Sequence, residues 1–311
     1  MLEMPQPVKA TRLSSNTLGL AAILLTVILW AVAANVAHDL FTAGVNPLEL
    51  AGVSAMIATF GLAILDSFFG RSSARAMNWQ QFALGLVLVL LVGADYVAIE
   101  QLPVAVAIVL LFTAPILVVL WTALVSRRIP SRTVLLALIL SVIGVVLVSN
   151  LLVDDISQIN WFGMGIGLIT AVCFAAYVIL SEKISATAEP LGVMLKTFAV
   201  ASLFWIAYQL TLGLAEMLLT PENFPKVLVV GIAGNLLPYL LFFWSIQRVA
   251  AERAAIVATL EPAIAAVLAW VWFGQMLTIM QILGGVLIVI AVTWLQLKST
   301  STVPVQASEH P

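Results

Sequence analysis

The sequence predicts an all-α, polytopic membrane protein with ten transmembrane helices, arranged as two inverted five-helix repeats. Of its 311 residues, 63% are hydrophobic and only 9% are charged, which lies outside the composition of soluble globular domains. The apolar runs continue for about twenty residues, the length of a helix that crosses a hydrocarbon core roughly 30 Å thick. A β-barrel would instead need shorter segments of alternating polarity.

The apolar segments are separated by turn-forming residues, such as Asn46-Pro47 and Glu189-Pro190. The first run starts near Leu18 and is not followed by a small-residue cleavage site, so we predict a retained helix and not a signal peptide. The predicted spans are 17–37, 47–69, 79–98, 103–125, 132–150, 161–181, 190–212, 226–246, 253–273 and 278–297.

The second half of the chain repeats the plan of the first half. Residues 99–147 align without a gap on residues 246–294, and this alignment places Pro115 on Pro262. Because a unit with an odd number of spans ends on the opposite side of the membrane, the second copy is inverted, as in many secondary transporters. The predicted segments are a cytoplasmic N-terminal tail (1–16), the first repeat (17–150), a periplasmic linker (151–160), the second repeat (161–297) and a cytoplasmic C-terminal tail (298–311).

Basic residues near the span ends predict the orientation, because Lys and Arg are retained on the cytoplasmic side. With both termini in the cytoplasm, the outer loops hold Lys226 as their basic residue and carry acidic residues such as Asp39 and Asp154. The cytoplasmic segments then hold Lys9, Arg12, Arg71, Arg75, Arg127, Arg128, Arg132, Lys183, Arg248, Arg253 and Lys298. We therefore predict an N-in, C-in protein of the bacterial inner membrane.

Glu261 is the principal candidate for a functional residue inside a span. At 1.5 Å per residue it lies roughly 13 Å deep, where an ionised carboxylate costs about 2.5–3.5 kcal/mol on insertion scales. Two interpretations stay open: Glu261 braces the helix that Pro262 interrupts, or it binds a proton or a cationic group of a substrate. The other candidate cavity-lining residues are Trp30, Asp95, Tyr96, Tyr177, Lys196 and Tyr239.

Each of these other candidates also has a purely structural interpretation. Lys196 is close enough to the cytoplasmic end of its span to reach the membrane interface. Asp95, next to Tyr96, either lines an outer vestibule or is a satisfied carboxylate near a helix end. Trp30 and the two remaining tyrosines lie well inside their spans, so they either line a pocket or pack in the core.

Three prolines inside predicted spans are candidates for helix kinks and gating positions. Proline has no backbone N–H and so frees a carbonyl one turn back in a helix. Pro115, Pro238 and Pro262 are therefore predicted to interrupt their helices and to act as hinges.

The sequence argues against an enzyme and against resident cofactors. The two histidines, His38 and His310, cannot form an HExxH metal site or a Ser-His pair inside a span. The chain has no GxxxxGK[ST] phosphate loop, and its single cysteine, Cys173, has no partner in the chain. A net charge of -2 without a basic patch gives no basis for nucleic-acid binding.

The C-terminal half contains YLLFFWSIQRVAAERAA, then LEPAIAAVLAWVWFG and LTIMQILGGVLIVI. These segments resemble the signature of EamA-type members of the drug/metabolite transporter superfamily, and LPVAVAIVLLFTAP followed by SRRIP is similar to the fourth span of the subset that includes amino-acid exporters. The resemblance implies a ten-span carrier with a central cavity. It places Glu261 on the family's Leu-Glu-Pro glutamate and Trp30 on its first-span tryptophan, whereas Ala33 stands where many members have asparagine.

The predicted function is a secondary transporter that exports small metabolites, amino acids or related amphipathic compounds, or drugs, by alternating access. The alternatives are an uncoupled facilitator or importer with the same fold, and a non-transporting membrane scaffold. The expected partners are a small-molecule substrate, bilayer lipid and protons as the coupling ion. We expect a monomer or homodimer.

Overall fold

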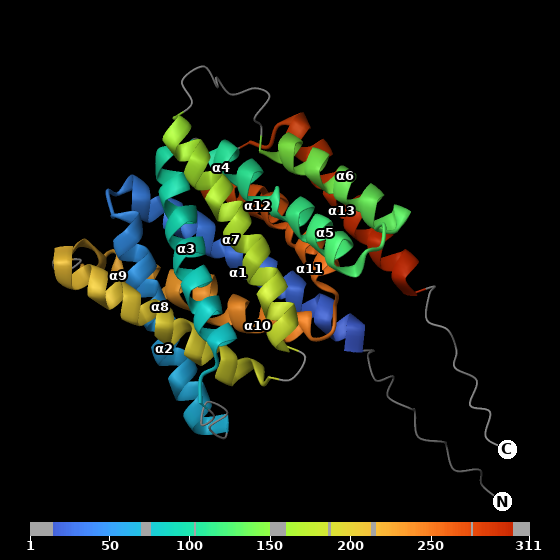
Figure 1. Cartoon of the computed structure of the whole chain (residues 1–311). Helices are drawn as coiled ribbons and strands as arrows, with labels where there is room; N and C mark the ends of the chain where they lie inside the picture. Colours follow the sequence, from blue (N-terminus) through green and yellow to red (C-terminus); the bar gives the residue numbers. More distant parts are fainter. Residues whose placement is uncertain are drawn as a thin grey trace, which may run out of the picture.

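The computed structural model describes residues 15–69, 76–102, 104–149, 160–185, 188–212, 216–274 and 276–300. Within these ranges the regular secondary structure is entirely helical (Figure 1). The predicted tails and the linker lie outside these ranges, apart from a few residues at helix ends. The charged residues outside them include Lys9, Arg12, Arg71, Arg75 and Asp154.

Each predicted span corresponds to one helix or to an interrupted helix. The elements are α1 (Ser15–Thr42), α2 (Pro47–Phe69), α3 (Trp79–Gln101), α4 (Val104–Leu111), α5 (Ala114–Ser126), α6 (Arg132–Val148), α7 (Trp161–Ser185), α8 (Pro190–Leu212), the 3-10 helix η2 (Glu216–Leu219), α9 (Phe224–Val229), the π-helix η3 (Val230–Leu236), α10 (Leu237–Ile246), α11 (Ala251–Ala258), α12 (Glu261–Phe273) and α13 (Ile279–Thr300).

The described ranges contain nine helical segments that are long and apolar enough to cross a membrane. The remaining apolar helix, α6, has 17 residues, so it extends about 25 Å at 1.5 Å per residue. This length is at the lower limit for crossing a core roughly 30 Å thick. The tenth span and the N-in, C-in orientation therefore stay predictions.

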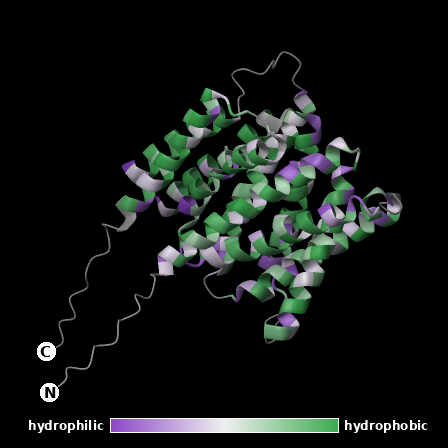
Figure 2. Ribbon diagram, turned by 180° about the vertical axis from the view of Figure 1, so that it is seen from behind, coloured by the Kyte–Doolittle hydropathy of each residue, from purple (hydrophilic) through white to green (hydrophobic). Residues whose placement is uncertain are grey.

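Hydrophobic residues make up most of the length of the helices (Figure 2), and many of them are exposed on the outside of the helix bundle. Phe60, Leu124 and Leu210 are among many large apolar residues that are exposed on helix surfaces. A soluble monomer rarely exposes contiguous apolar surface on this scale. The surface suits a surrounding bilayer.

The two halves pack through equivalent helices. The second helix of each half forms one such pair, α2 with α8, and the last helix of each half forms another, α6 with α13. The contact of α3 with α7 is mirrored by that of α1 with α10. This pattern is that of a pseudo-two-fold relation between the halves.

The contact between α6 and α13 depends on two glycines. A Cβ added to Gly284 would lie 2.6 Å from the Gly144 carbonyl oxygen, and a Cβ added to Gly144 would lie 2.9 Å from the Gly284 carbonyl oxygen. Glycine therefore permits the two backbones to approach closely, as small residues do in membrane helix pairs.

The helix bounds agree with the alignment of the two halves. That alignment superimposes the bounds of α4 on those of α11, and the bounds of α5 on those of α12. At the matching C-caps, Arg127 has φ 52° and Gly274 has φ 66°, both in the left-handed region. Four residues further on in each half, the side-chain hydroxyls of Ser131 and Thr278 each accept a hydrogen bond from a backbone N–H in the first turn of the next helix. The halves share local backbone geometry as well as helix order.

Prolines mark the two matching interruptions, as predicted. The break between α4 and α5 is followed by Pro115, and the break between α11 and α12 is followed by Pro262. Each proline lies in the first turn of the helix that follows the break, where a backbone N–H would have no acceptor within that helix. The gating role of these prolines stays a prediction.

Candidate binding cavity

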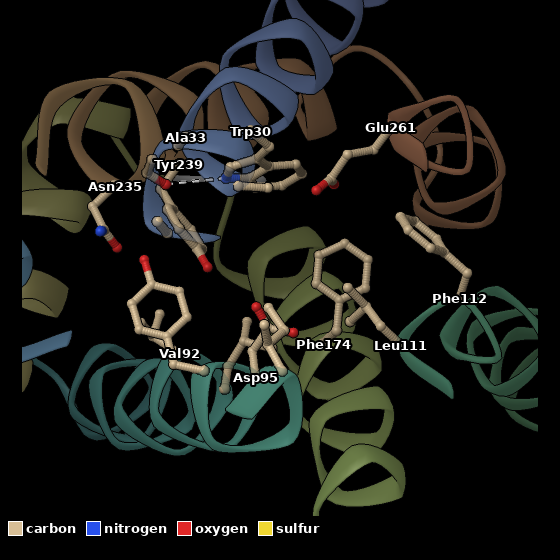
Figure 3. Close-up of a pocket in the computed structure, with 16 residues that line it drawn as sticks. Trp30, Ala33, Val92, Asp95, Leu111, Phe112, Phe174, Asn235, Tyr239 and Glu261 are labelled. Carbon is tan, nitrogen blue, oxygen red and sulfur yellow. Dashed lines mark hydrogen bonds between the residues drawn. The ribbon is translucent and has the colours of Figure 1, made fainter. Parts of the chain in front are cut away.

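A cavity lies between the two halves of the molecule (Figure 3). Its volume is about 90 Å³, counted as space open to the centres of water molecules. One water needs about 10–15 Å³ on this measure, so the cavity has room for several waters or a small solute. Its polar and aromatic lining residues are Trp30, Asp95, Tyr96, Phe112, Phe174, Asn235, Tyr239 and Glu261.

The two matching helix breaks, between α4 and α5 and between α11 and α12, both border this cavity. Leu111 and Phe112 line it at the break between α4 and α5, and Glu261 lines it at the first residue of α12. Ala37 and Ile99 also line it, and they lie near the C-terminal ends of α1 and α3. The cavity is thus nearer to the side of the bundle where α1 and α3 end.

Two carboxylates point into the cavity from opposite walls, Asp95 from α3 and Glu261 from α12 (Figure 3). Both side chains are half-buried, and no hydrogen bond or ion pair joins either one to another described residue. A carboxylate inside a membrane protein is expected to face water, to be protonated or to have a cationic partner. Two such groups in one small cavity make it a strong candidate for binding a cation or protons.

Aromatic rings form one end of the cavity. The ring centroid of Trp30 lies 5.5 Å from that of Tyr239 and 6.0 Å from that of Phe174, both in edge-to-face geometry. Beyond them, toward the C-terminal ends of α7 and α10, lie the fully buried rings of Tyr177 and Phe242, with centroids 6.1 Å apart. This aromatic cluster is densely packed and separates the cavity from that end of the bundle.

The position of Trp30 follows from the third helix interruption. Pro238 has no N–H to donate to the Gly234 carbonyl one turn back. The Trp30 indole N–H donates to that carbonyl oxygen at 3.2 Å. Thr26, one turn earlier on α1, donates its hydroxyl to the Pro238 carbonyl oxygen at 3.3 Å. Two side-chain hydrogen bonds therefore hold α1 against η3 and α10, and one of them goes to the carbonyl that Pro238 leaves without its α-helical donor.

Asn235 lies in the π-helix η3 and faces the same cavity. The residue is only 2% exposed, and its side-chain nitrogen has no hydrogen-bond partner among the described residues. A buried polar donor without a partner is costly, and such a group calls for an explanation such as a bound water or ligand. π-Helical turns are frequent at functional sites.

The structure gathers most of the predicted cavity residues in one place. Tyr177 is fully buried and packs behind Tyr239, with ring centroids 5.2 Å apart, so it supports the cavity and does not line it. Lys196 lies half-buried on α8 and is not among the described residues that line the cavity. The predicted residues that line the cavity are Trp30, Asp95, Tyr96, Tyr239 and Glu261.

Three of the polar and aromatic lining residues were not among the predicted site residues: Phe112, Phe174 and Asn235. The two phenylalanines are indistinguishable in the sequence from the many other apolar residues of the spans. Asn235 carried a usable signal, since it is a lone amide inside an apolar run, three residues before Pro238.

Residues 17–150 and 161–297 each match the EamA-like transporter family. The chain belongs to the EamA-like transporter family. Its match in both halves agrees with the repeated helix bounds described above. As an EamA-like transporter, it is a multi-pass protein of the inner membrane.

Similar proteins are themselves described as transporters. The threonine/homoserine exporter RhtA of Escherichia coli strain K12 is 29% identical over 236 residues, which cover 75% of this chain and 77% of RhtA. An uncharacterised transporter of Archaeoglobus fulgidus is 28% identical over 200 residues, which cover 64% of this chain and 70% of the relative. The names of both relatives thus describe membrane transport.

A solved structure has the same fold. A crystal structure of a protein with 16% sequence identity superimposes with a TM-score of 0.76, covering 94% of this chain and 99% of that chain. At this identity the likeness concerns the fold alone.

Proposed function

We propose that this EamA-like transporter exports small amphipathic metabolites, amino acids or related compounds, through the cavity between its two halves. The proposal is supported chiefly by the position of the cavity, which borders two interrupted helices and contains two carboxylates that no described residue pairs with. Carriers with inverted repeats bind their substrates at such helix breaks between the repeats. The similarity to an exporter named for threonine and homoserine gives the first substrate class to test.

The pseudo-two-fold relation of the halves supports a proposed mechanism of alternating access. The aromatic cluster around Trp30 and Tyr239 closes the cavity toward the ends of α7 and α10. If each half adopted the conformation that the other half has in this structure, the rings would separate and the cavity would open toward the ends of α7 and α10. The opposite end of the cavity would then close. Pro115, Pro238 and Pro262 each lack a backbone N–H, and we propose that these positions act as hinges.

Glu261 is the proposed coupling residue. It lies at the interruption of a membrane helix, it faces the cavity, and no described residue neutralises it. Proton uptake from one side and release on the other would allow the transmembrane gradient to drive export, with the protons as coupling ion.

The test measures efflux of radiolabelled threonine, homoserine, leucine and small amines from proteoliposomes that contain the purified protein. We expect efflux of one substrate class that depends on an imposed proton gradient and that falls by about 10²-fold in Glu261→Gln, the range for positioned proton-transfer groups. Glu100→Gln is the matched control, because Glu100 is exposed at the end of α3 and away from the cavity.

Two outcomes would contradict this proposal in different ways. Efflux that is insensitive to the proton gradient and to Glu261→Gln would favour an uncoupled facilitator and assign Glu261 a bracing role. The absence of flux of every compound in both directions would favour a scaffold without transport activity.

A further inference from the structure

We infer that the cavity selects the protonated amino group of a small organic amine and disfavours compounds that carry a free carboxylate. The inference rests on the proposed transport function and narrows its substrate class. It predicts that an amino acid whose carboxylate is absent or esterified binds more tightly than the amino acid itself.

The first argument is the charge of the cavity wall. Asp95 and Glu261 contribute two carboxylates from opposite sides, and none of the described residues that line the cavity is basic (Figure 3). Lys196, the cation that the sequence placed in a neighbouring span, is not one of those lining residues. A substrate ammonium would therefore have two carboxylate partners, whereas a substrate carboxylate would have no cationic partner.

The second argument is the hydrogen-bonding capacity of the wall. An ammonium group has three N–H donors and accepts nothing, which matches carboxylate oxygens that lack donors. The side-chain nitrogen of Asn235, on the wall formed by η3, has no hydrogen-bond partner among the described residues, so it can donate to an acceptor on the ligand. A hydroxyl, ester or amide oxygen supplies such an acceptor without placing a third negative charge beside Asp95 and Glu261.

The third argument is the apolar part of the cavity. The Trp30 ring meets the rings of Phe174 and Tyr239 edge to face at one end of the cavity, and an aromatic ring attracts a cation over its face. The remaining space is lined largely by small and aliphatic residues, such as Ala33 and Val92. With a volume of about 90 Å³, the cavity suits a short apolar chain that ends in an amino group.

A metal ion fits these residues less well than an ammonium group does. Divalent calcium takes six to eight oxygen ligands, and sites for it usually combine several carboxylates. Within the described residues there is no group of three or more His, Cys, Asp and Glu side chains that could hold a metal ion. Two carboxylates on opposite walls of a cavity that is also lined by a neutral amide and aromatic rings are better suited to an organic cation.

The experiment compares four compounds that share one aliphatic body: leucine, leucine methyl ester, 3-methylbutylamine and 4-methylpentanoate. Binding to the purified full-length protein is measured by isothermal titration calorimetry at pH 7, where an aliphatic amine carries its proton. We expect the amine and the ester to bind at least tenfold more tightly than leucine, and 4-methylpentanoate not to bind.

Variants assign this selectivity to residues. Asp95→Asn is expected to weaken binding of 3-methylbutylamine at least tenfold, whereas Glu100→Gln leaves it unchanged. Asn235→Leu is expected to weaken binding of the ester more than binding of the amine, because only the ester offers an acceptor to the amide. Size-exclusion profiles and thermal unfolding identify any variant that has lost its fold, and the wild-type selectivity series does not depend on the variants.

Leucine binding as tight as, or tighter than, that of the amine would overturn the inference, and so would the failure of the amine and the ester to bind. Efflux of the same compounds from proteoliposomes separates this result from the proposed function. Export of leucine without amine selectivity would leave the transport proposal standing and remove the inference. Selective amine binding without any flux would leave the inference standing and remove the transport proposal.

Discussion

The two proline breaks have the same backbone geometry and different chemistry. In the first half, the break between α4 and α5 places Ala114 before Pro115, and Ala114 is completely buried in the core. In the second half, the matching position is Glu261 before Pro262, and its carboxylate faces the cavity. The fold is therefore repeated, whereas the ionisable group is present once, so symmetry governs the scaffold and not the binding site.

The largest effect is expected from placing a carboxylate at the first break. Ala114→Glu would bury a charge at a position with no exposed surface, and an uncompensated buried charge costs about 3–5 kcal/mol. We expect little folded protein by size-exclusion chromatography of a fluorescent fusion. Ala43→Glu, in the exposed turn after α1, is the control and is expected to fold normally. Normal folding of Ala114→Glu would show that the two breaks have similar surroundings.

Making the second break resemble the first is expected to remove function and to leave the fold intact. Glu261→Ala takes away a carboxylate that has no hydrogen bond or ion pair with a described residue. We therefore expect the free energy of unfolding to change by less than about 1 kcal/mol, while gradient-driven efflux is lost. A loss of several kcal/mol with efflux retained would instead identify Glu261 as a structural brace. Thermal unfolding and efflux are measured on the same preparation.

The prolines are expected to give smaller and nearly equal effects, because the bounds of the flanking helices match in the two halves. Pro115→Ala and Pro262→Ala each restore an N–H that allows the helix to continue through its break. We expect each substitution to slow transport a few-fold and to leave substrate affinity unchanged. Strongly unequal effects on the transport rate would show that only one half moves.

The smallest effects are expected at the matching C-caps. Arg127 occupies a left-handed conformation that is unfavourable for a residue with a Cβ, and Gly274 occupies it without that cost. We expect Arg127→Gly to raise the free energy of unfolding by about 0.5–1 kcal/mol, and Gly274→Ala to lower it by about 1 kcal/mol. Thermal unfolding in detergent tests both. An opposite sign at either position would contradict the shared cap geometry.

Much of the helix architecture could be predicted from the sequence because the signals are local. The predicted limits of the second and seventh spans coincide with the bounds of α2 and α8. In both cases a proline at the first helical position, preceded by a polar residue, fixes the start. The proline breaks were equally visible in the sequence. These features depend on neighbouring residues and not on long-range packing.

The cavity could be predicted only in part, because its shape depends on side chains from seven helical elements. Glu261 and Asp95 were identifiable as ionisable groups inside apolar runs, but their facing arrangement was not. Lys196 has the same sequence signal, and it lies on α8 outside the cavity wall. The position of the Asn235 side chain in the cavity depends on the π-helical register of η3, and no local sequence pattern predicts that register.

The pairing of α2 with α8, and of α6 with α13, makes the interface between the halves isologous, like that of a two-fold homodimer. A dimer of identical five-helix units would have to carry the membrane glutamate in both copies or in neither. Because both copies lie in one polypeptide, their sequences can diverge, and Ala114 can stand opposite Glu261 in the repeat. Covalent fusion of the halves is thus what allows a symmetric scaffold to hold a single, unduplicated carboxylate at its helix break.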